Sequence, residues 1–160
     1  MDEAGRIIYT AFKQIAAQHN FPADFPSIEA GVRTARFNIA HEQCFGVVAE
    51  DGGRLIGSAY LHQRDPIEGI GPVSVDPAAQ ARGAGRAMMQ ALLERAAAAP
   101  GVRLVQDAFN TVSMPLYASL GFEVREPLAL VQGTPRAAPN PAIEVRPMSE
   151  ADLPACVALC

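Results

Sequence analysis

The 160-residue sequence predicts an α/β domain in which helices flank a central mixed sheet. Two amphipathic helical patterns come first, three short strand patterns follow, and an alanine-rich helix then leads into a further strand. A strand, a helix and a strand in this order are typical of a right-handed crossover between parallel strands. The earlier strands are instead close enough in sequence to form an antiparallel hairpin. The sheet is therefore expected to contain both kinds of pairing.

The two helices at the front of the chain are predicted by spacing and by their ends. Residues 2–19 carry apolar side chains at helical intervals, and a segment with two prolines stops the pattern. Ser27 is a suitable N-cap for a second helix that runs to about His41, because its hydroxyl can accept a hydrogen bond from the first turn.

The strands that follow are predicted by composition and by turn residues. Residues 44–50 are rich in strand formers, Asp51-Gly52-Gly53 makes a tight turn, and residues 55–62 return as the hairpin partner. Residues 70–75 form another short strand, which Asp76-Pro77 closes.

The second half of the chain predicts the crossover. Residues 85–99 carry one apolar helical face and stop at a proline-glycine pair, and residues 102–109 form the next strand. Residues 113–120 form a short helix, with Gly121 as its C-terminal cap. Residues 122–132 are expected to supply one or two further strands.

Composition and charge exclude several classes of protein. A net charge of −4 gives no broad basic surface for nucleic acid. Nucleic acid is therefore not an expected partner. No stretch reaches the roughly 18 apolar residues of a membrane span, so a membrane is not expected either. The cysteines form neither a disulfide framework nor a paired metal-ligand motif; they are Cys44, Cys156 and Cys160. A cytoplasmic protein with reduced thiols is expected.

A glycine-rich loop at residues 80–86 is the main chemical signal. It lies between a strand and the start of a helix, where free N–H groups and the helix dipole attract anions. Gly83 and Gly85 let the backbone approach a ligand, and Arg82 and Arg86 add positive charge, so a pyrophosphate fits there. The loop lacks the third glycine of a dinucleotide fingerprint and the Gly-Lys-Ser/Thr of a Walker loop. The alternative reading is a loop that only turns a corner.

Together with later positions, this loop resembles the GCN5-related N-acetyltransferase (GNAT) superfamily. The loop motif reads Gln80, Gly83, Gly85 and follows residues 73–77. The family also has an Asn after the next strand, and a Tyr in the following short helix that leads into Leu-Gly-Phe. The matching residues here are Asn110, Tyr117 and Leu120-Gly121-Phe122. The resemblance covers about residues 73–122 and implies a three-layer fold with a central mixed, splayed sheet.

The resemblance also implies an activity, the movement of an acetyl group from acetyl-CoA to a primary amine of a small molecule or peptide by direct attack. The pantetheine arm would enter between splayed parallel strands, and the pyrophosphate would lie on the loop. The donor-binding positions would be Val73, Val75, Gln80, Arg82, Gly83, Ala84, Gly85, Arg86 and Asn110. Tyr117 would act as the general acid on the leaving thiolate, because a phenol with a pKa near ~10 can donate a proton or a hydrogen bond.

Plainer roles remain open for these residues. Tyr117 can instead be a core aromatic of an amphipathic helix, and Asn110 a turn residue at a strand end. The general base is not identified by sequence, although His62, Asp65 and Glu68 lie just before the central strand. The histidines show no metal-ligand spacing, so no metal is expected. The alternative function is a non-catalytic acyl-CoA-binding sensor or support domain.

The chain departs from the family at both ends. The usual N-terminal edge strand is missing from its place, so residues 1–132 are expected to form the catalytic domain without it. Residues 133–142 form a Pro-rich linker. Residues 143–160 read as a strand and a Ser-capped helix, either the start of a second domain, as in a tandem protein, or a plain extension. This strand is expected to pair with the edge at residues 44–50, within one chain or in a swapped homodimer.

Overall fold

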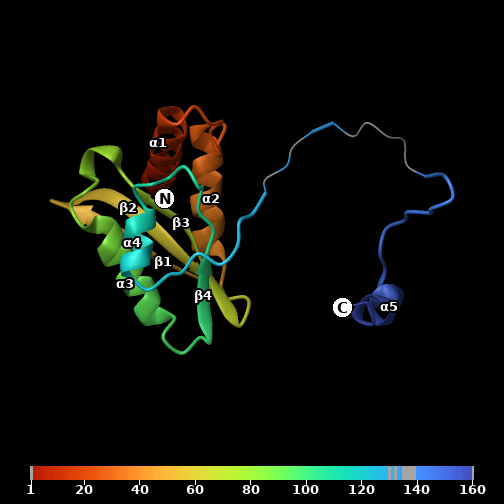
Figure 1. Cartoon of the computed structure of the whole chain (residues 1–160). Helices are drawn as coiled ribbons and strands as arrows, with labels where there is room; N and C mark the ends of the chain where they lie inside the picture. Colours follow the sequence, from red (N-terminus) through yellow and green to blue (C-terminus); the bar gives the residue numbers. More distant parts are fainter. Residues whose placement is uncertain (1, 130, 132, 135–139, 160) are drawn as a thin grey trace. The chain divides into compact units, whose positions relative to one another are not determined.

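The computed structural model describes residues 2–129, 131, 133–134 and 140–159, in two compact units that divide after Val124. The first unit carries a four-stranded sheet and the helices that cover it (Figure 1). The second unit has two short helical segments and no strand among its described residues. The predicted site residues all belong to the first unit.

Both predicted N-terminal helices form. They are α1, Asp2–Gln18, and α2, Ile28–Ala40, which lie side by side (Figure 1). Ser27 caps α2 as expected, since its hydroxyl accepts a hydrogen bond from the backbone N–H of Ala30 at 3.3 Å.

Two glycines allow α1 and α2 to cross at close range. A Cβ on Gly5 would overlap the backbone of Val32, and a Cβ on Gly31 would overlap the carbonyl oxygen of Gly5. The overlapping atoms are backbone atoms, which cannot rotate away. The helix pair therefore depends on glycine at both positions.

Gly5→Ala should lower the free energy of unfolding by about 2 kcal/mol or more, because the methyl group would push two packed helices apart. Thermal or urea unfolding of the purified variant measures this loss. Gly85→Ala is the matched control, since its added methyl would meet side-chain atoms of Leu116 and Val75 at 3.5 and 3.7 Å, which are ordinary contact distances. Equal stability of the two variants would contradict the tight crossing.

The sheet is mixed, as predicted. Its strands are β1, Cys44–Asp51, β2, Arg54–His62, β3, Ile67–Val75, and β4, Gly101–Leu104, in the order β1-β2-β3-β4. The pairs β1–β2 and β2–β3 are antiparallel, and β3–β4 is parallel. Gly52 and Gly53 form the β1–β2 turn with positive φ angles of 58° and 78°, which suit a two-residue hairpin.

Helices cover both faces of this sheet, which gives three layers. Side chains of a strand alternate between faces, and the middle of β2 shows this directly. Ala59 and Leu61 are buried against α3, Ala84–Arg95, whereas Tyr60 is buried on the other face with Ile8 of α1. The predicted three-layer α/β fold is confirmed.

The parallel strands β3 and β4 part after a short run of pairing. Residues 67–70 pair with residues 101–104, and β4 ends at Leu104, five residues earlier than predicted. Residues 71–75 of β3 therefore have no partner from β4. The chain returns through a loop to α4, Met114–Ser119, which ends before Gly121 at a φ of 92°.

The strands expected in residues 122–132 are not found in the described part of that range, residues 122–129 and 131. Pro127 cannot donate to a strand ladder, and Val124 is 84% exposed, so this segment has neither the donor nor the burial that favours a strand. That prediction was wrong for these residues, while residues 130 and 132 lie outside the described part.

The second unit confirms the Ser-capped helix but not the strand before it. Ser149 forms a capping box with Asp152, and α5, Leu153–Val157, follows the short helix η2, Glu150–Asp152. Residues 143–148 form no strand in the single chain. Their pairing with β1, in one chain or in a dimer, stays a prediction. Cys160 and linker residues 135–139 lie outside the described part.

Candidate functional site

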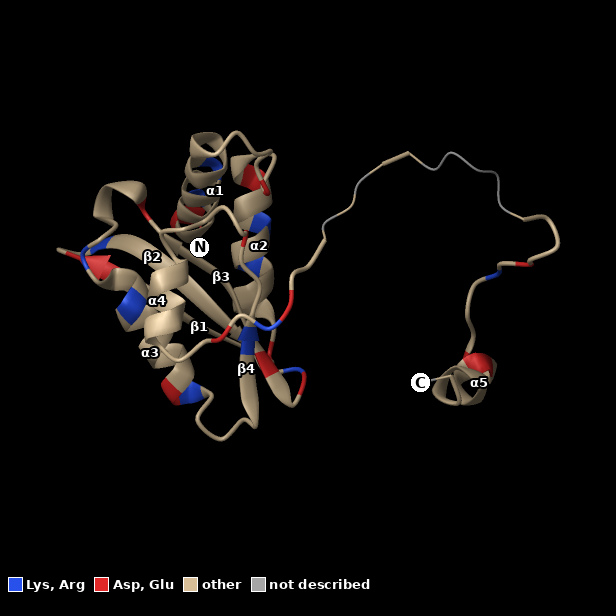
Figure 2. Cartoon of the chain, in the orientation of Figure 1, with Lys and Arg blue, Asp and Glu red and all other residues tan. Residues whose placement is uncertain are grey.

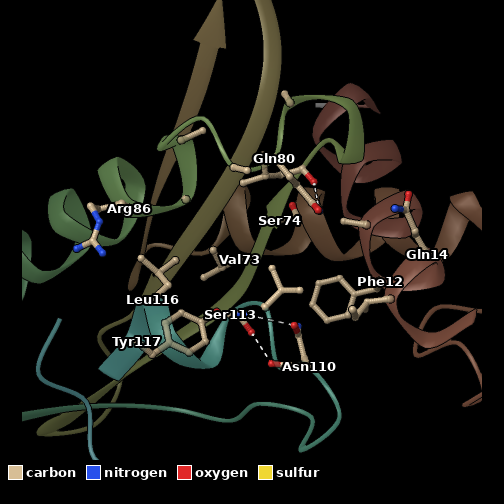
Figure 3. A pocket seen from close by; sticks show the side chains of 18 of the residues that line it. Phe12, Gln14, Val73, Ser74, Gln80, Arg86, Asn110, Ser113, Leu116 and Tyr117 are labelled. Atoms are coloured by element: carbon tan, nitrogen blue, oxygen red, sulfur yellow. Dashed lines mark hydrogen bonds between the residues drawn. The ribbon is translucent and has the colours of Figure 1, made fainter. Parts of the chain in front are cut away.

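A cavity of about 350 Å³ opens where β3 and β4 part. Figure 3 shows its labelled side chains, which come from α1, β3, the loop before α3, the first turn of α3, and α4 with the loop that precedes it. It is lined by Ala11, Phe12, Gln14, Ile15, Gln18, Val73, Ser74, Val75, Ala79, Gln80, Ala81, Gly83, Ala84, Gly85, Arg86, Asn110, Val112, Ser113, Leu116 and Tyr117.

The strand side of the cavity is the part of β3 that lacks a β4 partner. Val73 and Val75, two of the predicted donor-binding residues, line the cavity. Between them, Ser74 is buried and its hydroxyl lies 3.3 Å from that of Ser58 on β2. On the side away from β2, backbone groups of β3 can therefore accept a further extended segment.

The glycine-rich loop supplies the anion-attracting part. Ala81 and Gly83 both have positive φ, 61° and 88°, and Gly83 is the N-cap of α3. No side chain of the described residues caps this helix, so the N–H groups of its first turn remain available to a ligand. The positive φ at Gly83 explains why glycine stands there, because a residue with a Cβ is strained in that conformation.

The predicted polar side chains of the loop differ in where they point. Gln80 lines the cavity and donates to the carbonyl oxygen of Val75 at 3.2 Å, which ties the loop to the end of β3. Arg86 also lines it and donates to the hydroxyl of Ser119 on α4 at 2.7 Å. Arg82 does not reach the cavity, because its guanidinium pairs with the carboxylate of Asp51 at 2.8 Å.

Tyr117 lies on α4 and lines the cavity together with Leu116 (Figure 3). Its ring meets that of Phe122 edge to face at a centroid distance of 6.0 Å. Burial raises the pKa of Tyr117 above its usual value, and the hydroxyl of Ser113 partly opposes this rise. The phenol is therefore protonated at neutral pH.

Asn110 makes the turn hydrogen bond that was one of its two expected roles, and its contact with the donor stays a prediction. It lines the cavity, and its side-chain oxygen accepts a hydrogen bond from the backbone N–H of Ser113 at 3.3 Å. That bond is the turn role expected of an Asn that follows a strand.

Several lining residues were missed by sequence reasoning. Phe12, Gln14, Ile15 and Gln18 come from α1, on the opposite wall from Tyr117, and Figure 3 shows the Phe12 ring facing into the cavity. The helical spacing of Phe12 and Ile15 was visible, but it predicted only an apolar face. Ser113 was also missed, although its position four residues before Tyr117 could have suggested it.

The three candidates for a general base lie outside the cavity. His62 Nε2 is 2.8 Å from the carbonyl oxygen of Gly71, and the Asp65 carboxylate pairs with Arg103 at 3.2 Å. Glu68 accepts from the Gln63 side chain at 3.0 Å, and its second oxygen is buried without a partner in the described part of the chain. Among the residues that line the cavity, only Arg86 and Tyr117 are titratable.

Other features of the described residues are unremarkable for binding. Figure 2 shows acidic and basic positions interspersed on the first unit. Within the described ranges, no three His, Cys, Asp or Glu side chains gather closely enough to hold a metal ion. No helix in those ranges combines the length and the apolar character that crossing a membrane requires.

Comparison of the sequence with known families gives one result that covers most of the first unit. The model of the acetyltransferase (GNAT) family matches residues 9–122. No curated protein matches the sequence.

Comparison of the structure with solved structures gives the same fold. A mutant protein from Bacillus halodurans is 19% identical with a TM-score of 0.67, over 82% of this chain and 92% of that one. A predicted acetyltransferase from Clostridium acetobutylicum, solved with acetyl-CoA, is 14% identical with a TM-score of 0.60, over 82% and 92%. A ribosomal-protein-alanine N-acetyltransferase from Escherichia coli is 23% identical with a TM-score of 0.60, over 78% and 73%.

Proposed function

Because the chain belongs to the GNAT family of acetyltransferases, we propose that it moves an acetyl group from acetyl-CoA to a primary amine of a small molecule or peptide. The observation that carries this proposal is the cavity at the opening between β3 and β4. It combines an uncapped helix N-terminus, a segment of β3 that lacks a β4 partner, and a protonated phenol within one space.

Acetyl-CoA would bind between the glycine-rich loop and the exposed backbone of β3. Free N–H groups from Gly83 to Arg86 attract the pyrophosphate, and the Arg86 guanidinium adds a positive charge close by. The backbone of Val73 and Val75 offers hydrogen bonds to the amides of the pantetheine arm, in the manner of an added strand. Gln80 and Asn110 support the loops at either end, whereas the Arg82 guanidinium is paired with Asp51.

The acetyl group would then be transferred directly, with no acyl-enzyme. The amine nitrogen attacks the thioester carbonyl carbon, and the tetrahedral intermediate expels the thiolate as the C–S bond breaks. The phenol of Tyr117 gives its proton to the sulfur, the nitrogen loses a proton to water, and water returns a proton to the phenolate. The raised pKa of Tyr117 keeps the phenol protonated at neutral pH, which is the form that this step requires.

The test of this proposal is acetyl-CoA-dependent thiol release, measured with a chromogenic thiol reagent against amino acids, polyamines, aminoglycosides and peptide N-termini. We expect release that requires both acetyl-CoA and one class of amine, with the acetylated amine confirmed by mass spectrometry. Calorimetric titration with acetyl-CoA runs in parallel. Binding without release on every acceptor class would favour the non-catalytic acyl-CoA-binding module, and absence of binding would refute both functions.

A further inference from the structure

One wall of the cavity is left over once acetyl-CoA is placed as proposed. The donor would occupy the glycine-rich loop and the backbone of β3, with its thioester beside Tyr117. Phe12 lies across the cavity from Tyr117 (Figure 3), so an attacking amine must enter between the two. The side chains of α1 that line this side form the α1 wall, which consists of Ala11, Phe12, Gln14, Ile15 and Gln18.

The large side chains on this side of the cavity are apolar. The Phe12 ring is held edge to face by Phe25, with the ring centroids 5.2 Å apart and the planes at 86°, and Ile15 lies beside it on the α1 wall. Val112 also lines the cavity, although it is 69% exposed to solvent. Exposed apolar side chains at a cavity are typical of a surface that a ligand covers.

The polar side chains of the α1 wall carry no charge. Gln14 and Gln18 are four residues apart, so they lie on the same face of α1. Their amides can form hydrogen bonds with hydroxyl or carbonyl groups of a ligand. They cannot neutralise a charged group, as an ionised side chain of the opposite sign does.

Opposite charges are also missing from the rest of the cavity. Of the described residues that line it, none is acidic. Asp24 follows α1 and Asp107 lies in the loop before α4, but neither lines the cavity. Arg86 is the basic residue of the lining; it is bound to Ser119, and the pyrophosphate would use its charge. A further charge on the acceptor would therefore enter the cavity unpaired, which is costly.

We infer that, if the proposed function is right, the preferred acceptor is a primary amine whose nearest substituent is apolar and uncharged, bound against Phe12 and Ile15. Arylalkylamines and peptides with an apolar first residue share this chemistry. Polyamines, aminoglycosides and free amino acids do not, because each carries at least one further charge.

The first measurement compares kcat/KM for pairs of acceptors that differ in charge. The value for 2-phenylethylamine should exceed that for 1,4-diaminobutane by about tenfold or more, the scale that one group in an apolar pocket provides. The dipeptide amide phenylalanyl-alanine should exceed arginyl-alanine by a similar factor. Comparison between the pairs shows whether a small amine or a peptide is the better source of the apolar group. Equal or faster acetylation of the charged member in either pair would overturn the inference and leave the proposed function intact.

Gln14→Glu tests the charge argument without removing a packed side chain. It adds a carboxylate at an exposed position of the α1 wall, so the preference for 2-phenylethylamine over 1,4-diaminobutane should shrink about fivefold, as expected for one exposed ion pair. Gln90→Glu is the matched control, since it makes the same change at an exposed position of α3 outside the cavity. An equal preference in the two variants would contradict the placement of the acceptor at the α1 wall.

A binding measurement separates this inference from the proposed function. Calorimetric titration of the protein saturated with CoA should show tighter binding of 2-phenylethylamine than of 1,4-diaminobutane. This preference in a protein that acetylates no amine would support the apolar subsite and refute the proposed catalysis. If neither amine binds and neither is acetylated, the apolar subsite is refuted as well.

Discussion

Tyr117→Phe should lower kcat by about 100-fold or more, the usual scale for loss of a general acid, while the affinity for acetyl-CoA stays within a factor of about two. The reason lies in what the substitution removes. The ring packs with Phe122 and the core of the first unit, and phenylalanine keeps this packing. Only the proton donor is lost. Steady-state kinetics on a validated acceptor, with calorimetry for the donor, measure both quantities.

Tyr9→Phe is the matched control for this loss. The Tyr9 phenol accepts from the Lys13 ammonium at 3.1 Å on α1 and does not line the cavity, so its removal should leave kcat unchanged. Similar turnover for the Tyr117 and Tyr9 variants would mean that Tyr117 serves only as a core aromatic.

Gly83→Val should reduce acetyl-CoA binding by about 100-fold or more while the protein stays folded. A β-branched residue at a φ of 88° is strained, so the loop must change its backbone and turn its N–H groups away from the ligand. An added Cβ at Gly83 meets no atom within 4 Å, so packing itself is not disturbed. Calorimetric titration measures the binding, and circular dichroism checks the fold.

Gly53→Val separates strain from binding. Gly53 also has a positive φ, 78°, with no atom within 4 Å of an added Cβ, but it lies in the β1–β2 turn outside the cavity. Both variants should lose a similar amount of stability, about 1–2 kcal/mol, and only Gly83→Val should lose the ligand. If the Gly83→Val and Gly53→Val variants bind acetyl-CoA equally well, the glycine-rich loop is not part of the binding site.

The sequence by itself determined the elements whose cause is local. The helical period of residues 2–19, the Ser27 cap and the Gly52-Gly53 turn each depend on interactions within a few residues, and each forms as expected. The glycine-rich loop also belongs to this class, because its position between a strand and a helix already supplies free N–H groups. The order of elements then predicted the mixed sheet.

Only the tertiary structure decided which side chains meet in the cavity. Phe12 on α1 and Tyr117 on α4 face one cavity although about a hundred residues separate them, and no local pattern encodes that distance. The Arg82 side chain was expected at the pyrophosphate, but in the structure it forms an ion pair with Asp51, which lies at the end of β1. The length of β4 and the absence of strands in residues 122–129 likewise depend on partners elsewhere in the chain. A strand forms only where a neighbour satisfies its backbone groups, and spacing along the sequence does not show whether that neighbour is present.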